Sequence, residues 1–479
     1  MRPHDLLKIP QKAATVLFHA QLRDMKHIAL IAGCAAISLH ACATTSSPIA
    51  RGTVTTAAKA FPFPTTQRTL ANGLRVFIVE HDSPGLVAYY SIVRVGSRNE
   101  VEPGKSGFAH FFEHMMFRGT PTYPTDRYNA AIKAMGADSN AFTSDDMTVY
   151  HILASATALP TIVEIEADRF QHLEYGEAEF QKEARAVLGE YNKGASDPMQ
   201  PMAEALFDSA FQVHPYKHTT IGFLQDIVEM PKQFAYSRQF FSRYYRPDNV
   251  VLLIVGDVTP DQVMPLVEKH YGSWRSGPSR PAVPVEPPQT KDKRVSVPWK
   301  GAGMPMLLRG YHVPAFSTKT IDSAALEVLS ELVFAERAPL FRRLVLEEQK
   351  AEHLDGGCER HIDPNLFLVL AKVKDAADIP YVEAAIDEEL ARVAREGVDE
   401  ETITQVVSHT RYAFANMLST ADRTALAGAD FLALTGELAT IDEAFAMLAK
   451  VTAADVKRVA ARYFTPKNRT VVVLEPEAS

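Results

Sequence analysis

The chain has 479 residues, of which 46% are hydrophobic, 9% aromatic and 23% charged, the balance of a globular protein. Its formal net charge of −8, from 50 basic and 58 acidic residues, disfavours a nucleic-acid-binding protein, because such proteins are usually basic. Three cysteines are too few for a disulfide framework or a four-cysteine zinc module, and the length exceeds one compact core, so we expect several domains.

Residues 25–42 have the pattern of a secretory signal. Met25 opens a short basic stretch, which is followed by an apolar run too short to span a bilayer. We therefore expect translation to start at Met25 and residues 1–24 to be an upstream segment outside the natural protein. A cytosolic processing enzyme would require that residues 25–42 not act as a signal.

The signal ends in Leu-His-Ala-Cys, which resembles a bacterial lipobox with Cys42 as the residue that is lipidated. The histidine is unusual at its position, and cleavage after Ala43 in an A-x-A pattern remains the alternative. Both routes predict a periplasmic protein, anchored to a membrane by lipid in the first and free in the second. Residues 43–60 would then form a flexible tether.

A proline-rich stretch divides the rest of the chain into two parts of similar size. The prolines between residues 276 and 295 oppose both helix and sheet. We expect a stiff linker over residues 276–295, between a zinc-binding domain at 61–275 and a homologous domain at 296–479.

The two parts resemble each other near their ends. Residues 243–249 and 462–468 both follow the pattern Arg-Tyr-aromatic-x-Pro-x-Asn, and each precedes an apolar run typical of a strand. A chance recurrence of a helix-stop signal is the alternative to a duplicated domain. Strand-like runs followed by helix-like runs favour an α+β fold of two homologous domains, each an antiparallel sheet packed with helices. The expected elements are an Asn-Gly hairpin at 70–74, a strand at 87–95 and helices at 159–173, 180–191, 321–343 and 381–396.

The strongest chemical motif is His-x-x-Glu-His at residues 110–114. On a helix, His110 and His114 share one face, so both imidazoles can reach one metal ion. Two neutral imidazoles suit Zn²⁺, and the carboxylate of Glu113 beside them can accept the proton of a water molecule. Two histidines on a polar helix face, with a solvated glutamate as neighbour, remain the alternative.

A catalytic zinc ion needs a third protein ligand and one open position. Glu183 and Glu190 lie seven residues apart, which is two helical turns, so they share a face of the helix expected at 180–191. Spacing alone does not select them, because paired glutamates usually mark a solvated helix face.

Together these motifs resemble the pitrilysin family of zinc peptidases, and most closely its two-domain bacterial members, over residues 61–475. The distance between the histidine motif and the glutamate helix is similar to that in the family. The resemblance implies one Zn²⁺ per chain, with His110, His114 and Glu190 as ligands, Glu113 as the catalytic base and Glu183 as an assisting carboxylate.

Residues 136–144 resemble the strand to which this family adds a peptide substrate as a further β-strand. The resemblance implies that Asn140, Ala141 and Phe142 bind substrate. An ordinary edge strand after a glycine turn is the alternative.

The sequence departs from the family in its second half, where active members carry an arginine and a tyrosine seven residues apart. Leu346 and His353 occupy the matching positions. Because such a tyrosine helps to stabilise the developing oxyanion, the resemblance implies a heterodimer with a homologous subunit that carries the Arg/Tyr pair. A homodimer that uses His353 or another donor is the alternative.

We therefore expect a periplasmic zinc metalloendopeptidase that hydrolyses peptides or unfolded protein segments. The competing hypothesis is a non-catalytic peptide-binding or scaffold subunit of a peptidase-like complex. The missing Arg/Tyr pair favours this second hypothesis, whereas the complete set of zinc ligands and base opposes it.

Overall fold

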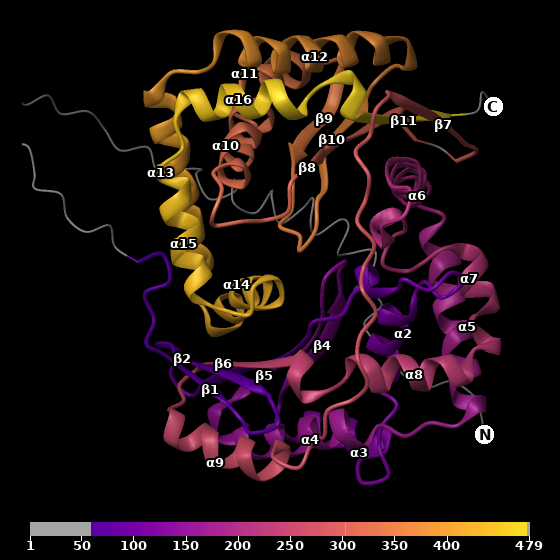
Figure 1. Ribbon diagram of the computed structural model, residues 1–479, viewed down its shortest axis with the longest axis vertical. Coiled ribbons are helices and arrows are strands. Elements are labelled where there is room, and N and C mark those ends of the chain that lie inside the picture. The colour runs from indigo at the N-terminus through magenta and orange to yellow at the C-terminus, as the bar shows by residue number, and fades with distance from the viewer. Residues whose placement is uncertain (1–58, 302, 477–479) are drawn as a thin grey trace, which may run out of the picture.

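The computed structural model describes residues 59–301 and 303–476. The signal at 25–42, Cys42 and nearly all of the expected tether lie outside these residues. Figure 1 shows two α/β halves, one above the other, and an extended segment that runs between them. Residues 274–290 of this segment contain neither helix nor strand. No helix in the described ranges has both the length and the apolar character needed to cross a membrane.

The first half is built on a six-stranded sheet with the order β1-β2-β6-β3-β5-β4. Neighbouring strands pair antiparallel, except for β2 and β6, which are parallel. The strands are β1 (Thr65–Thr69), β2 (Arg75–Glu80), β3 (Leu86–Val93), β4 (Asp138–Thr143), β5 (Thr148–Ser155) and β6 (Val250–Gly256).

Helices cover one face of this sheet and share a buried apolar core with it. The core includes phenylalanines of α2, α4, α5 and α8 together with alternate residues of the strands. The helices of this half are α2 (Phe108–Met115), α3 (Thr125–Ala134), α4 (Leu159–His172), α5 (Glu177–Gly194), α6 (Met199–Ala210), α7 (Leu224–Glu229), α8 (Phe234–Tyr244) and α9 (Pro260–Tyr271).

The second half has a five-stranded sheet with the order β7-β11-β8-β10-β9. Its strands are β7 (Lys293–Trp299), β8 (Met306–Val313), β9 (Ala351–Gly357), β10 (Asn365–Val373) and β11 (Arg469–Pro476). Its helices are α10 (Asp322–Phe334), α11 (Pro339–Phe341), α12 (Ile379–Glu396), α13 (Glu400–Met417), α14 (Ala421–Leu434), α15 (Ala439–Leu448) and α16 (Ala453–Tyr463).

The two sheets have the same topology once β1 is set aside. Strands β2 to β6 correspond in chain order to β7 to β11, and in each sheet the first and last of these strands form the parallel pair. The repeated asparagine makes the same contacts in both halves. Asn249 Nδ2 donates to the carbonyl of Tyr244 at 2.9 Å, and Asn468 Nδ2 donates to that of Tyr463 at 2.8 Å. The predicted α+β fold of two related sheet-and-helix units is confirmed.

One helix of each half packs on the sheet of the other half. Helix α14 packs across β3 and β6 of the first sheet, and α6 packs on β7, β8 and β11 of the second. The apolar core around α6 joins Leu206 of the first half to Leu308 and Val472 of the second. This exchange of helices makes the halves one continuous packed body, because burying these apolar surfaces stabilises their association.

One expected helix is wrong in its extent. The helix expected at 321–343 ends at Phe334, and the chain continues as a separate short helix from Pro339 and then a π-helical turn over Arg342–Glu347. Proline restricts the preceding residue to extended conformations, and Ala338 accordingly has φ −68° and ψ 146°.

Candidate metal centre

Helix α2 carries the histidine motif on a face opposite a fully buried aromatic face. Phe108, Phe111 and Phe112 are buried in the core of the first half, which fixes the rotation of the helix about its axis. The helix begins after Gly107, whose φ is +89° and where a Cβ atom would lie 2.6 Å from a backbone oxygen of Ile221. Only glycine fits this conformation and this space without strain.

Buried Glu100 anchors the start of α2. Its two carboxylate oxygens each accept a backbone N–H at 2.7 Å, from Gly107 and from Ala109. Burial raises the pKa of Glu100 to about 8, although the backbone hydrogen bonds oppose this shift. These bonds satisfy N–H groups that a helix start otherwise leaves without partners.

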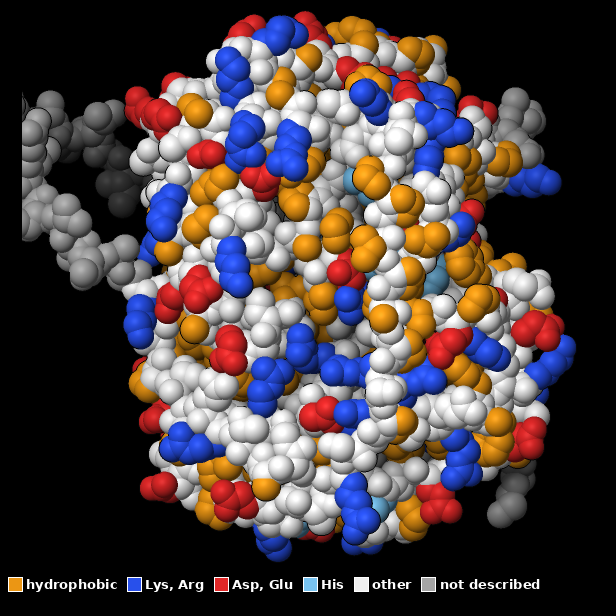
Figure 2. All heavy atoms as spheres, in the orientation of Figure 1, with side chains coloured by type: hydrophobic (Ala, Val, Ile, Leu, Met, Phe, Trp, Pro, Cys, Tyr) orange, Lys and Arg blue, Asp and Glu red, His pale blue; other side chains and the backbone are white. Residues whose placement is uncertain are grey.

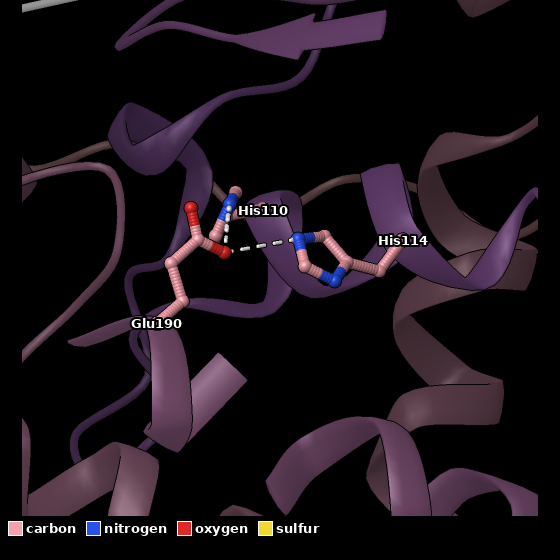
Figure 3. Close-up of side chains that lie close together, drawn as sticks. All are labelled: His110, His114 and Glu190. Atoms are coloured by element: carbon pink, nitrogen blue, oxygen red, sulfur yellow. Dashed lines mark ion pairs between the residues drawn. The ribbon is translucent and has the colours of Figure 1, made fainter. Parts of the chain in front are cut away.

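Helix α5 packs beside α2 and brings a carboxylate to the two histidines. Oε2 of Glu190 lies 3.6 Å from Nε2 of His110 and 3.3 Å from Nε2 of His114 (Figure 3). One donor atom from each of the three residues lies within 4.8 Å of the others. Ligand atoms of a tetrahedral zinc site lie about 3.3 Å apart, given metal–ligand bonds of about 2.0 Å. The donor set and its spacing therefore fit Zn²⁺.

Glu183 contacts the ring nitrogen of His114 that does not face Glu190. Its Oε1 is 2.9 Å from Nδ1 of His114, and its Oε2 is 2.5 Å from Nη2 of Arg118. The contact engages Nδ1 and leaves Nε2 of His114 directed at Glu190. A carboxylate on the outer nitrogen of a metal-binding histidine fixes the tautomer and orientation of the ring.

The charges of the cluster are strongly coupled. Burial by itself lowers the pKa of His114, but its hydrogen bonds to Glu183 and Glu190 outweigh burial and raise the pKa to about 10. Burial would raise the pKa of Glu190, but the hydrogen bond from His114 and the charge of His110 lower it to about 2. For His110 burial dominates and lowers the pKa. The two carboxylates thus favour a positive charge on His114, whereas burial disfavours one on His110.

Glu113 is adjacent to His114 in sequence and is itself 8% exposed. Its Oε2 accepts a hydrogen bond of 2.7 Å from Oγ1 of Thr143, the last residue of β4. The sequence alone did not indicate a role for Thr143 or Glu100. Neither residue lies at a distance from the histidine motif that is typical of a known functional pattern. Only the packing of β4 and of the loop before α2 reveals their contacts.

Asn140, Ala141 and Phe142 lie on β4, which is the last strand in the order of the first sheet. The strand pairs with β5, with Asn140 opposite His151 and Phe142 opposite Val149. Among the described strands, β4 pairs only with β5, so its other edge offers backbone groups to a further strand. Helix α2 packs against β4, so this edge belongs to the same region as the histidines.

The two positions that match the family's Arg/Tyr pair lie in the second half. Leu346 is 59% exposed on the π-helical turn, and His353 is a partly buried residue of β9.

Comparison with known proteins agrees with this architecture. The family description "Insulinase (Peptidase family M16)" matches residues 76–222, and "Peptidase M16 inactive domain" matches residues 235–409. The chain belongs to the M16 peptidase family, the group of insulinase and pitrilysin. The resemblance inferred from the histidine motif and the glutamate helix is therefore confirmed.

Individual relatives cover different shares of the chain. "Zinc protease PqqE" of Helicobacter pylori is 29% identical over 416 residues, which are 85% of this chain and 92% of that protein. The bovine mitochondrial-processing peptidase subunit beta is 31% identical over 220 residues, 46% of this chain and 44% of that protein.

Solved structures show the same fold. A protease from Helicobacter pylori superposes with a TM-score of 0.81 at 29% identity, covering 86% of this chain and 100% of that one. Pitrilysin superposes with a TM-score of 0.74 at 19% identity, covering 87% of this chain and 45% of that one, and at this identity the likeness concerns the fold alone.

Proposed function

We propose that this chain is a zinc metalloendopeptidase that hydrolyses peptides or unfolded protein segments, with one Zn²⁺ held by His110, His114 and Glu190. The convergence of these three side chains (Figure 3) is the observation that carries the proposal, and the charge of Glu113 acts on both histidines. The peptidase family and the relatives named zinc proteases support it.

Glu113 is the proposed general base. A zinc ion bound at this site would act as a Lewis acid that polarises the scissile carbonyl and makes water acidic enough to react near neutral pH. The carboxylate of Glu113 takes the proton of the attacking water and delivers it to the leaving amine. Glu183 assists by holding His114 in the orientation that the site requires.

The free edge of β4 is the proposed binding site for the peptide. A substrate that adds to this edge as a strand would be held by backbone hydrogen bonds, which do not depend on its side chains. Residues Asn140, Ala141 and Phe142 would line the bound strand. This mode of binding suits extended or unfolded segments, because a folded substrate has its backbone groups already paired.

A homologous partner subunit is the proposed source of the oxyanion donor. The side chain of Leu346 cannot donate a hydrogen bond, and His353 lies on β9 in the second half. Losing one oxyanion donor costs about 3–4 kcal/mol of transition-state stabilisation in other proteases, so a peptidase rarely dispenses with it. The bovine relative is named as the beta subunit of a processing peptidase. A homodimer that uses His353 remains the alternative.

The proposed location is the periplasm, either free or anchored by lipid at Cys42. The sequence pattern at residues 25–42 supports secretion. A fold relative at 18% identity is titled a periplasmic protease of Escherichia coli. Cell fractionation with a Cys42→Ser variant distinguishes the two forms, because only a lipoprotein moves from the membrane to the soluble fraction on this substitution.

Cleavage of a mixed peptide pool by the purified, zinc-loaded protein tests the proposal, with products identified by mass spectrometry. Glu113→Gln is the control, because it keeps the size of the side chain and should retain zinc while abolishing turnover. Cleavage by the wild-type protein and not by Glu113→Gln supports a self-sufficient peptidase. Cleavage that appears only after a homologous subunit is added supports the heterodimer. Equal cleavage by Glu113→Gln would contradict the role of Glu113.

One observation favours the alternative of a non-catalytic peptide-binding subunit, namely the absence of the Arg/Tyr pair at residues 346 and 353. Binding of labelled peptides without cleavage, under every partner condition and with zinc present, would support this alternative.

A further inference from the structure

We infer that Thr143 is a positioning residue that holds the carboxylate of Glu113 in its working orientation, an inference that rests on the proposed function. Oγ1 of Thr143 donates a hydrogen bond of 2.7 Å to Oε2 of Glu113. Thr143 ends β4 and Glu113 belongs to α2. The bond therefore joins the proposed substrate strand directly to the proposed base.

The alternation of side chains along β4 explains why this hydroxyl reaches α2. Ala141 points into the core that α2 shares with the sheet, and the Ser139 hydroxyl meets the Tyr128 hydroxyl of α3 at 3.3 Å. Thr143 follows at the same period of two and faces the same helices. Asn140 and Phe142 lie on the opposite face of the strand, away from Glu113.

Both partners of the bond are shielded from solvent, Thr143 being 5% exposed and Glu113 8%. A hydrogen bond to a carboxylate in such surroundings is stronger than one between neutral groups. Threonine is branched at Cβ, which restricts its χ1 angle and hence the direction of the hydroxyl.

The turn after Thr143 is fixed by the neighbouring backbone. Within the turn, the Ser144 N–H donates to the Met147 carbonyl at 2.8 Å. From outside, the Arg98 N–H donates to the Asp145 carbonyl at 2.9 Å, and the Ser97 hydroxyl donates to the Asp145 carboxylate at the same distance. A Cβ atom at Gly96 would lie 2.2 Å from the Ser144 carbonyl oxygen, so the two segments are in close backbone contact.

The second half also braces this turn. Oδ2 of Asp146 accepts the backbone N–H of Ile362 at 3.1 Å, and its Oδ1 accepts the hydroxyl of Tyr216 at 2.7 Å. The loop between β9 and β10 thereby supports the end of β4. The position of Thr143, and through it the angle of the Glu113 carboxylate, depends on contacts from both halves of the chain.

The test is a set of threonine substitutions in the full-length, zinc-loaded protein. Thr143→Val keeps the shape of the side chain and removes the donor, and we expect kcat to fall about 10- to 100-fold, because small misplacement of a reacting group has effects of this size. KM and zinc content should stay within about twofold of wild type, since the substituted atom contacts neither the ligands nor the free edge of β4. Thr143→Ser restores the hydroxyl and should recover kcat to within about threefold.

Thr148→Val is the matched control. Thr148 lies directly opposite Thr143 in the hairpin and is fully buried, and its hydroxyl donates to the Val95 carbonyl at 2.9 Å. The same substitution there should lower thermal stability to a similar degree and leave kcat near that of wild type. Equal losses of kcat in Thr143→Val, Thr143→Ser and Thr148→Val would reduce the role of Thr143 to general support of the hairpin and overturn the inference.

A second measurement does not need activity. In zinc-free protein, the fall in Tm is measured for Thr143→Val, for Glu113→Ala and for the double variant. If the hydrogen bond exists, the double variant loses less than the sum of the single losses. Additive losses would overturn the inference even in an active protein. Coupled losses in a protein that cleaves no peptide, whether or not a homologous subunit is added, would refute the proposed function and leave the Thr143–Glu113 contact standing.

Discussion

Asp146 of the first half and His361 of the second meet across the boundary between them, with Oδ2 of the carboxylate 3.2 Å from Nδ1 of the imidazole. The pair belongs to a wider ionic network. Asp363 binds Arg98 at 2.6 Å and His214 at 3.0 Å, and Arg98 lies 3.8 Å from Asp146. These contacts hold the loop between β9 and β10 against the turn that follows β4.

The network predicts how stability depends on pH. Burial lowers the pKa of His361, but the hydrogen bond to Asp146 and the charges of Asp146, Asp145 and Glu359 outweigh it and raise the pKa to about 9. A histidine whose pKa is raised in the folded state makes its full contribution to folding stability at pH values below its unfolded-state pKa of about 6.5. The contribution, about 3 kcal/mol at most, is then lost as pH rises through 9.

Equilibrium unfolding of wild type and His361→Asn between pH 6 and 9.5 measures this contribution. We expect the two proteins to differ most near pH 6 and to converge at the alkaline end. A constant difference across this range would mean that the charge of His361 does not contribute to stability.

Removing either type of ligand should remove the metal. His110→Ala and Glu190→Ala each leave two of three protein donors, and we expect both purified proteins to contain far less than one zinc per chain. Glu177→Ala is the control, because Glu177 is an exposed residue of the same helix as Glu190. Metal analysis by plasma emission decides the point, and normal zinc in both ligand variants would refute the assignment.

The contacts of Glu183 should tune zinc affinity without supplying a ligand. We expect Glu183→Gln to weaken zinc binding about 10- to 100-fold, the usual effect of losing such a partner of a ligand histidine. Arg118→Met should have a smaller effect in the same direction, because Arg118 acts on His114 only through Glu183. Competition with a chromophoric chelator gives both affinities. Weaker zinc binding by Arg118→Met than by Glu183→Gln would contradict this arrangement.

The end of α14 should be sensitive to a single methyl group. Gly436 has φ +83°, its carbonyl accepts a hydrogen bond of 2.9 Å from Arg75 of β2, and a Cβ atom there would clash with the Arg75 guanidinium. Gly436→Ala should therefore cost about 1–3 kcal/mol of unfolding free energy, from backbone strain and from displacement of Arg75.

Gly104→Ala separates the two causes. Gly104 has a similar φ of +75°, but a Cβ atom there would meet no heavy atom within 4 Å. Thermal unfolding should show a larger loss for Gly436→Ala than for Gly104→Ala. Equal losses would indicate that only backbone strain matters and that Arg75 moves aside at no cost.

The local structure around the histidine motif and the duplication of the fold could be predicted from the sequence. The period of an α-helix places His110 and His114 on one face, and the repeated Arg-Tyr-aromatic-x-Pro-x-Asn pattern indicates the duplication that the two sheets display. These are effects of short range, since a helix face or a strand start depends on residues a few positions apart. The family followed from the same motifs.

Tertiary structure decided what depends on the packing of distant segments. Sequence spacing alone did not select Glu190 over other carboxylates, and nothing in the sequence indicated that Thr143 would bind Glu113, 30 residues earlier. Two further features could not be predicted from the sequence, because they join residues from different halves. These are the packing of α6 and α14 on the sheet of the other half and the contact of His361 with Asp146. The single long helix expected at 321–343 ends at Phe334, where Ala335 is already extended, and Pro339 keeps Ala338 extended before the next helix begins. Side-chain contacts between elements depend on how the faces of those elements are turned against each other, and only the packed core determines that.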